Sequence, residues 1–344
     1  REYILESSLI YEIINIEDAQ VFSDAIVNSS ILSLKKTNTK NDNCLIVNKK
    51  YSLEEDFLTY IALNKFYYKQ NDFDSLPWNL IRPEVLKLRN KIKSKNPTLE
   101  KLQTKIRLGI ATGSNEAFVI SNEQRIKFIK EDSKSEEIIK PILRGKDIER
   151  YYYNSPDLYL ILSKNGVDVI NDYPVIYKHL DSFGDKFKKR GAKGKHWTNL
   201  RACSFFEDFK KDKIVWIELT DNGRFSSSNE EIYLLNSAYF LLPPKGLNKG
   251  YLLCLLNSKL IKFYLKQIAN TSGVGTLRWI NIYVKEFPIV LAEIQKQNEL
   301  DFKEKDISLK LINFNDLKVK FQTYLKQIFQ LQKLSKKLQN WHDL

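Results

Sequence analysis

The 344-residue sequence lacks several features that mark particular classes of protein. It contains no methionine, not even at position 1, and its three cysteines, Cys44, Cys203 and Cys254, form no Cys-x-x-Cys pair. The odd number and wide spacing of the cysteines exclude a disulfide framework or a zinc site, and favour reduced thiols. No apolar run approaches the about 20 residues that a membrane-spanning helix needs. We therefore expect a soluble, cytoplasmic protein with no membrane partner.

The motifs of several enzyme classes are also missing. There is no Gly-Lys-Ser/Thr loop for nucleotide phosphates, and no Glu-x-Lys tripeptide of the kind that metal-dependent nucleases use. The glycines of residues 273–278 follow a predicted helix rather than a strand, so they form no dinucleotide-binding loop. The three histidines, His179, His196 and His342, have no paired spacing. We expect neither a catalytic residue nor a metal site in this chain.

Positive charge, in contrast, is abundant. Lysine and arginine together number 55 against 42 acidic residues, which gives a net charge of +13 and an isoelectric point near 9.3. This excess indicates a polyanionic partner, and nucleic acid is favoured over an anionic membrane because neither terminus is a strongly amphipathic basic segment. Charge that serves only solubility is the alternative. The length and the 43% hydrophobic content support a folded chain with substantial cores.

The richest basic segment is residues 186–201, which holds seven lysine or arginine residues and no acidic residue. Its glycines, Gly191 and Gly194, let the segment adapt to a duplex, while its cations neutralise phosphates and an arginine can reach base edges. A solvated charged surface, with the tryptophan in the core, is the alternative. The predicted DNA contacts in this segment are Lys189, Arg190, Lys193, Lys195, Trp197 and Arg201.

Two glycine turns present further polar side chains. In residues 104–120 and 139–151, apolar segments meet tight turns that display small polar and basic groups. Ordinary surface turns are the alternative. A hairpin turn at residues 221–223 and a glycine-bearing loop at residues 271–278 add one arginine each. The predicted DNA contacts from these four loops are Thr112, Asn115, Arg144, Lys146, Arg224 and Arg278.

Hydrophobic spacing predicts the elements at both ends of the chain. Apolar residues between Tyr3 and Ile14 fall near helical spacing, and residues 25–34 alternate in the manner of a strand. Residues 315–344 again carry apolar side chains at helical spacing, with lysines on the other side. This pattern predicts a long C-terminal helix that packs its apolar stripe against its own protein.

The residues of the two glycine turns carry a family resemblance. Gly-Ile-Ala-Thr-Gly-Ser-Asn-Glu-Ala-Phe-Val at 109–119 and Lys-Pro-Ile-Leu-Arg-Gly-Lys-Asp-Ile-Glu-Arg-Tyr at 140–151 resemble the opening of the TaqI-like C-terminal specificity domain. That domain is the target-recognition part of adenine-specific DNA methyltransferases and of type IIG restriction-modification enzymes. Further matching segments follow in the order of the family, at residues 173–180, 190–201, 213–216, 251–260 and 287–289.

The resemblance implies a mixed α/β fold, with the strand-hairpin end of a methyltransferase domain ahead of a DNA target-recognition domain. In the family, the phenylalanine of a Val-Phe dipeptide near the end of the catalytic domain stacks on the flipped adenine. Phe22 matches that position, and a plain core residue is the alternative. We expect a methyltransferase fragment at 1–50, a helical linker at 51–100, the recognition domain at 101–290 and a C-terminal helical segment at 291–344.

The resemblance also implies a larger parent protein that uses S-adenosylmethionine. The Phe-x-Gly-x-Gly and Asn-Pro-Pro-Tyr motifs of the catalytic half do not occur in this sequence. Because the chain begins at Arg1 without an initiator or a signal peptide, we expect it to be the downstream part of the parent. Its expected partners are double-stranded DNA and the upstream methyltransferase domain. A free-standing specificity subunit and an α/β domain that binds an acidic protein are the alternatives.

Overall fold

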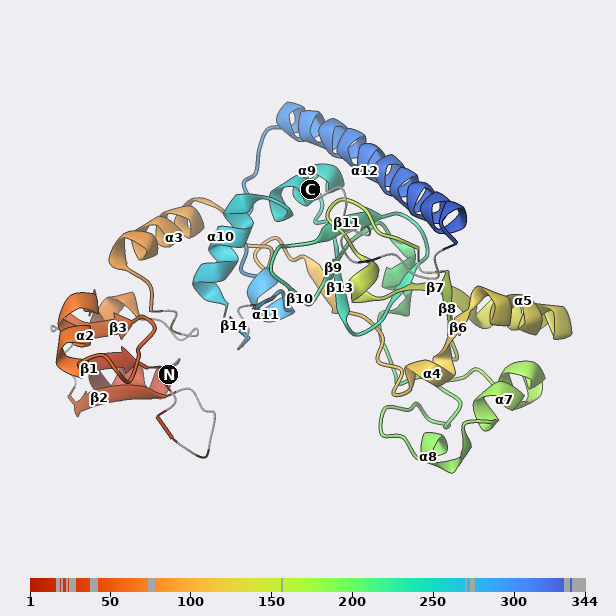
Figure 1. Cartoon of the computed structure of the whole chain (residues 1–344), viewed down its shortest axis with the longest axis horizontal. Coiled ribbons are helices and arrows are strands. Elements are labelled where there is room, and N and C mark those ends of the chain that lie inside the picture. Colours follow the sequence, from red (N-terminus) through yellow and green to blue (C-terminus); the bar gives the residue numbers. More distant parts are fainter. Residues whose placement is uncertain are drawn as a thin grey trace. The chain divides into compact units, whose positions relative to one another are not determined.

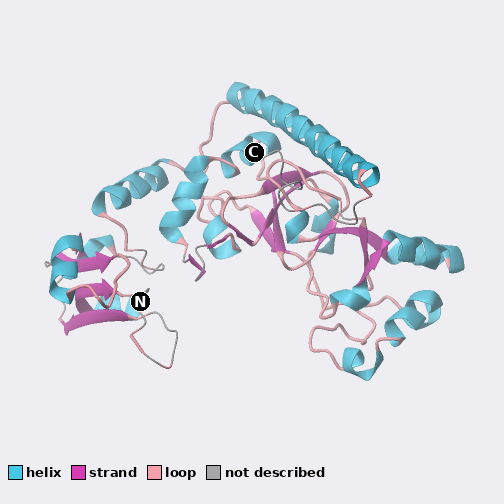
Figure 2. Cartoon of the chain, in the orientation of Figure 1, coloured by secondary structure: helices cyan, strands magenta, loops and turns pink. Residues whose placement is uncertain are grey.

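A computed structural model describes residues 1–16, 19, 21–22, 24, 29–37, 43–73, 78, 80–155, 157–269, 271–272, 276–330 and 335. The chain divides into two compact units, Arg1–Pro97 with Phe263–Arg278 and Thr98–Lys262 with Trp279–Leu344. Both units combine helices with small sheets, as Figure 1 and Figure 2 show. The mixed α/β fold class predicted from the sequence is confirmed. Among the described residues, no helix is both long and apolar enough to cross a membrane.

The first unit is built on a four-stranded sheet in the order β2-β1-β3-β4. Its strands are β1 (Ser8–Asn15), β2 (Ser30–Lys36), β3 (Asn43–Asn48) and β4 (Phe66–Lys69). β1 is parallel to β3, and the other neighbours are antiparallel. Its helices are α1 (Glu2–Ser7), α2 (Phe57–Asn64), the 3-10 turn η1 (Gln70–Asp72) and α3 (Pro83–Lys95). The two faces of the sheet are both covered, because neighbouring β3 residues Ile46 and Val47 belong to separate buried clusters.

A β-bulge explains why the helix predicted over residues 3–14 is wrong beyond Ser7. The pairing of β1 with β2 shifts register between Ile10 and Glu12. The extra residue reverses the alternation of faces, so Ile10 and Ile13 lie in the same buried cluster although they are three residues apart. Ile14 then points to the opposite cluster. The resulting spacing of buried residues is that of a helix, but it arises from a bulged strand in the middle of a sheet.

The second unit contains two four-stranded sheets, in the orders β11-β9-β13-β5 and β12-β7-β8-β6. The first consists of the antiparallel strands β5 (Lys105–Leu108), β9 (Lys213–Ile217), β11 (Phe225–Ser228) and β13 (Ala238–Leu242). The second consists of β6 (Val119–Ser121), β7 (Ile139–Leu143), β8 (Leu158–Ile161) and β12 (Tyr233–Leu234), with β12 parallel to β7. One buried cluster connects the two sheets, since Phe209 packs on both Tyr233 and Phe240.

Short helices connect these strands, and α10 crosses from one unit to the other. The α-helices are α4 (Asn115–Phe118), α5 (Asn122–Glu131), α6 (Val169–Asp172), α7 (Pro174–Asp181), α8 (Gly184–Lys188), α9 (Lys249–Leu256), α10 (Lys259–Ile268) and α11 (Asn281–Val284). The 3-10 turns are η2 (Ser133–Ile138), η3 (Gly145–Asp147) and η4 (Phe206–Lys210). The remaining short strands are β10 (Leu219–Thr220), β14 (Thr271–Ser272) and β15 (Thr276–Arg278).

The long helix α12 (Ile294–Ile328) begins well before the predicted segment at 315–344. Polar side chains attach it to its own unit: the Gly250 N–H donates to Asp301 Oδ1 over 3.0 Å, and the Asn248 N–H donates to Gln297 Oε1 over 2.9 Å. These acceptors serve the N–H groups at the start of α9, which have no partner within that helix. The prediction that the apolar stripe packs inward is wrong for the described part of α12, because Leu317 and Ile328 are 64% and 52% exposed.

Candidate nucleic-acid interface

On one side of the first sheet of the second unit, all four strands terminate at the same level. One row of paired residues crosses this sheet from strand to strand, namely Leu108, Tyr239, Trp216 and Phe225. The chain leaves β5 and β9 just beyond this row, and it enters β11 and β13 just before it. The residues adjoining the row on that side are Gly109, Ile217, Arg224 and Ala238. We call this side of the sheet the loop edge.

The turn that links β12 to β13 brings the second sheet to the loop edge. The Ile110 N–H, just after β5, donates to the Leu234 carbonyl over 2.6 Å. The Leu235 N–H donates to the carbonyl of Leu143, the last residue of β7, over 3.0 Å. The segments that follow β5, β7 and β12 therefore leave the two sheets at the same place, although they are far apart in sequence.

The segment after β7 places Arg144 and Lys146 at the loop edge. The Gly145 N–H donates to Ser237 Oγ over 3.0 Å, which fixes the turn against the start of β13. Arg144 donates from Nε and Nη2 to the two carboxylate oxygens of Asp147, each over 2.8 Å. This hydrogen bonding raises the pKa of Arg144, and about a third of its side chain remains exposed. Lys146 is exposed. A guanidinium that a buried carboxylate holds in a fixed position can bind a ligand without a change in its own conformation.

Arg224 is held at the loop edge in a similar way. Its Nη1 lies 3.1 Å from Glu149 Oε1, and 40% of its side chain is exposed. The backbone of the next residue is fixed by an amide side chain, because Asn257 Oδ1 accepts the Phe225 N–H and Asn257 Nδ2 donates to the Phe225 carbonyl. Arg224 and Arg144 are therefore two arginines in defined positions, each oriented by an acidic side chain.

The segment after β5 orients Asn115 through Thr112. Thr112 is buried, and its hydroxyl donates to Asn115 Oδ1 over 2.7 Å while accepting the Ser114 N–H over 3.2 Å. Asn115 itself is exposed at the start of α4. Gly113 has a φ of +72°, and a Cβ there would lie 2.7 Å from the Ala192 carbonyl oxygen. This segment therefore packs directly against the basic segment 186–201.

Arg190 organises that basic segment from the inside. Its guanidinium donates to the carbonyls of Thr112, Phe187, Trp197 and Asn199 over 2.6 to 3.4 Å. It also lies over the rings of Phe118 and Phe187. The side chain is 9% exposed, and burial lowers its pKa to about 10, so that it stays charged at neutral pH. The sequence predicts that Arg190 contacts DNA, but its guanidinium is buried. We therefore assign Arg190 the role of positioning the basic segment.

The other cations of the segment reach the surface. Lys189, Lys193, Lys195 and Arg201 are exposed. Trp197 is half-buried between the Phe187 ring, 5.9 Å away between centroids, and the Lys188 ammonium, 5.0 Å from the ring centroid. The indole of Trp197 therefore packs on the inner side of the segment, while the lysines face solvent. A fixed backbone with outward cations is the arrangement that phosphate binding requires.

Comparison with known proteins identifies this part of the chain. Residues 140–289 match the family model of the TaqI-like C-terminal specificity domain. These residues form a TaqI-like C-terminal specificity domain. The curated type II methyltransferase M.BstVI of Geobacillus stearothermophilus is 20% identical over 237 residues, which cover 65% of this chain and 41% of that protein. The chain thus spans about two fifths of the length of this relative.

Two solved structures match most of this chain. The type IIL restriction-modification enzyme MmeI, solved in complex with DNA, matches with a TM-score of 0.51 and 13% identity, over 89% of this chain and 39% of that one. The type IIG restriction endonuclease BpuSI matches with a TM-score of 0.43 and 10% identity, over 88% of this chain and 39% of that one. The likeness to MmeI extends the agreement in fold beyond the specificity domain.

The two remaining predicted residues, Phe22 and Arg278, belong to the first unit. Phe22 follows β1 and is 54% exposed, so its ring is accessible, as stacking on a base would require. Arg278 is exposed at the end of β15. The stacking role of Phe22 and the DNA contact of Arg278 stay predictions.

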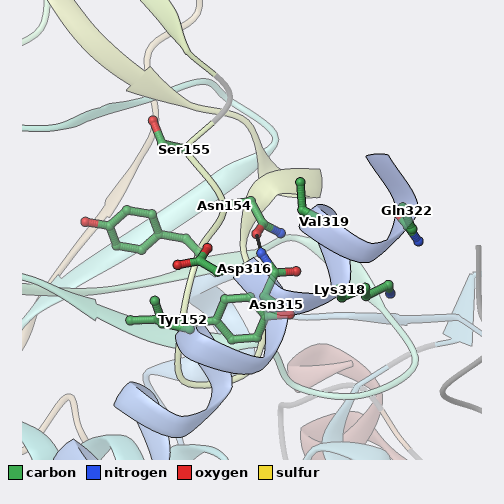
Figure 3. Close-up of a pocket in the computed structure, with 10 residues that line it drawn as sticks. Tyr152, Asn154, Ser155, Asn315, Asp316, Lys318, Val319 and Gln322 are labelled. Carbon is green, nitrogen blue, oxygen red and sulfur yellow. Dashed lines mark hydrogen bonds between the residues drawn. The ribbon is translucent and has the colours of Figure 1, made fainter. Parts of the chain in front are cut away.

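A polar cavity of about 500 Å³ lies in the second unit, between residues 152–155 and α12 (Figure 3). Asn315 on the helix donates from Nδ2 to Asn154 Oδ1 over 2.7 Å, and Asp316 and Lys318 also line the space. None of the predicted DNA contacts lines it. Within the described ranges, no three His, Cys, Asp or Glu side chains come together as a metal site requires.

The sequence interpretation missed Asn236 and Ser237 at the loop edge. Both are exposed, whereas the residues on either side of them, Leu235 and Ala238, are buried. A polar pair within the otherwise largely apolar run 232–242 was the available signal. It was not recognised because a polar pair between two strands is also the ordinary composition of a turn.

The pH dependence of stability should show whether His179 holds α4, the helix that begins at Asn115. His179 on α7 lies 2.9 Å from the Ala117 carbonyl in α4, and burial lowers the pKa of the imidazole below 6.5. The unfolded chain then binds the proton more readily, so the contribution of His179 is complete above pH 6.5 and is lost as the pH falls through its folded pKa. We expect His179→Gln, which keeps a donor to Ala117, to show a smaller drop in unfolding midpoint than the wild type on acidification. Equal drops in both proteins would contradict this assignment.

Proposed function

We propose that this chain recognises a specific double-stranded DNA sequence on behalf of an adenine-specific DNA methyltransferase of a type II or type IIG restriction-modification system. One observation carries the proposal. Segments distant in sequence bring Arg144, Lys146 and Arg224 to the loop edge, and the segment from Ile110 to Asn115 leads from this edge to the exposed cations of residues 186–201, through the contact of Gly113 with Ala192.

The two parts of this surface suit two tasks. Lysines on a fixed backbone bind phosphates without regard to sequence and set the position of the protein on the duplex. Arginines with a defined orientation can donate two hydrogen bonds to guanine O6 and N7 in the major groove. We assign the first task to the cations of residues 186–201 and the second to Arg144 and Arg224, and we propose Lys146 and Asn115 as further contacts.

The chemistry of the parent protein is proposed from its relatives. M.BstVI is a type II methyltransferase, and MmeI was solved in complex with DNA. We propose that the parent uses S-adenosylmethionine to methylate an adenine that Phe22 stacks on once the base is flipped. The Phe-x-Gly-x-Gly and Asn-Pro-Pro-Tyr motifs of the catalytic half do not occur in this chain. We assign cofactor binding and methyl transfer to an upstream methyltransferase domain in the same cytoplasmic protein.

The domain organisation that follows is part of the proposal. We propose the end of the methyltransferase domain at residues 1–50, a linker at 51–100, the recognition domain at 101–290 and a C-terminal helical segment at 291–344. The methyltransferase relative favours a fused enzyme over a free-standing specificity subunit.

A duplex-binding assay tests the proposal. The chain should enrich one sequence from a randomised duplex library, and that duplex should compete better than a scrambled one. An acidic protein or polyglutamate should compete poorly at equal charge. Binding to polyanions without any preference for duplex DNA would favour the alternative, in which the basic surface binds an acidic protein.

Removal of three exposed lysines should change the salt dependence of binding. Each lost phosphate contact lowers the slope of log affinity against log salt by about 0.9. We expect Lys189→Ala, Lys193→Ala and Lys195→Ala, combined, to flatten the slope measured from about 50 to about 200 mM salt, while the selected sequence stays the same. The matched control combines alanine at Lys87, Lys91 and Lys127, lysines that lie outside residues 186–201. A slope that changes equally in both triple variants would show that the basic segment has no special role.

A further inference from the structure

Asn236 lies at the loop edge, in the turn before β13, and its backbone is fixed on both sides. Its N–H donates to the Ile110 carbonyl over 3.1 Å, and the Ala238 N–H donates to the Leu235 carbonyl over 3.0 Å. The next residue, Ser237, accepts the Gly145 N–H of the segment that carries Arg144 and Lys146. Asn236 therefore stands between the segment that leads to Asn115 and the segment that leads to Arg144.

The turn itself does not require asparagine at this position. Asn236 is the second residue of the Leu235–Ala238 turn, whereas asparagine favours the first position of the common turns or a left-handed conformation. Asn236 is not one of the described residues that have a positive φ. Its amide side chain makes no hydrogen bond within the described part of the chain, and it is exposed. Neither folding nor capping accounts for the amide.

The neighbouring polar side chains are each oriented by a partner within the protein. Thr112 and the carboxamide oxygen of Asn115 bond to each other, Arg144 is paired with Asp147, and Arg224 is paired with Glu149. Asn236 is the side chain at this edge that offers a donor and an acceptor together on an immobile backbone. A carboxamide of this kind matches the N7 acceptor and N6 donor that adenine presents in the major groove.

We propose that Asn236 is a specificity-determining residue that reads one adenine of the recognition site. Its Nδ2 donates to adenine N7, and its Oδ1 accepts from adenine N6. The inference rests on the proposed function, because it assigns a base contact within the same DNA interface. It adds a recognition residue between the segments that lead to Asn115 and to Arg144, and gives it a defined base partner.

Selection from a randomised duplex library, followed by affinity measurements on the selected site, tests the assignment. We expect Asn236→Ala to lose the preference at one base pair, with roughly a 10- to 100-fold loss of affinity for the selected site. Binding to a scrambled duplex should be unchanged. Asn236→Asp should move the preference at that base pair toward cytosine, since a carboxylate accepts from cytosine N4. The matched control is Asn229→Ala, an exposed asparagine just after β11, at the end of that strand away from the loop edge.

The outcomes separate this inference from the proposed function. A wild-type chain that selects a site, together with an Asn236→Ala variant that selects the same site with equal affinity, would overturn the role of Asn236 and leave the proposed function intact. Equal loss with Asn229→Ala would also overturn it. A wild-type chain that selects no site would overturn both. Unchanged unfolding midpoints in the variants establish that any effect arises at the interface.

Discussion

Gly109→Ala is expected to lower the free energy of unfolding of the specificity domain by about 3 kcal/mol or more. A Cβ on Gly109 would lie 2.5 Å from the Leu235 carbonyl carbon and 2.7 Å from the Leu234 carbonyl oxygen, with the Leu235 oxygen closer still. These are backbone atoms in the turn that joins the two sheets, so no side chain can move aside. The new methyl group must separate β5 from β12, and the loop edge with it. Urea unfolding, followed by tryptophan fluorescence, measures the loss.

The control for this prediction is Gly191→Ala. Gly191 lies in the basic segment, its φ is not positive, and nothing lies within 4 Å of the position that a Cβ would take. We expect its alanine variant to unfold at the wild-type midpoint or slightly above, because alanine restricts the unfolded chain more than glycine does. A Gly109→Ala protein as stable as Gly191→Ala would show that the two sheets are not joined as described.

The second large effect is expected from Arg190→Ala. Removing the guanidinium takes a donor from four carbonyl oxygens. Those of Phe187 and Asn199 keep the backbone N–H donors of residues 190 and 194, but those of Thr112 and Trp197 lose the donor that the guanidinium supplies, and a buried group deprived of its partner costs about 1–3 kcal/mol. We expect a loss of about 3 kcal/mol in unfolding free energy, together with weaker binding to duplex DNA. Hydrogen exchange should accelerate at the amides of Gly194 and Asn199, which in the wild type donate to the carbonyls of Asn199 and His196 within the segment.

Two further variants separate positioning from contact. Lys189→Ala removes an exposed neighbouring cation, so it should weaken DNA binding and leave the unfolding midpoint unchanged. Arg190→Lys keeps the charge but offers three donors from a single nitrogen, so its stability should lie between wild type and Arg190→Ala. If Arg190→Ala weakened DNA binding with no change in stability or exchange, Arg190 would contact DNA directly and the positioning role would be wrong.

Several sequence-based expectations depended on information that the sequence does not display. The buried residues of β1 have helical spacing because a bulge lies between Ile10 and Glu12, and a bulge becomes visible only in the pairing of two strands. The stripe that includes Leu317 suggested an inward-facing helix surface, but the start of α9 needed hydrogen-bond acceptors, and polar residues of α12 such as Asp301 face it. In both cases, a distant segment determined the local arrangement.

The sequence by itself determined the fold class, the excess of positive charge, and the motifs by which the specificity domain is known. These properties are local or additive: they depend on residue counts, on short patterns and on turns whose residues are neighbours along the chain. Only the tertiary structure decided that Arg190 faces inward while Lys189 and Lys193 face solvent, and that the turn of Asn236 bonds to the segments of Ile110 and of Gly145. The physical reason is that burial and convergence depend on which distant segments pack together.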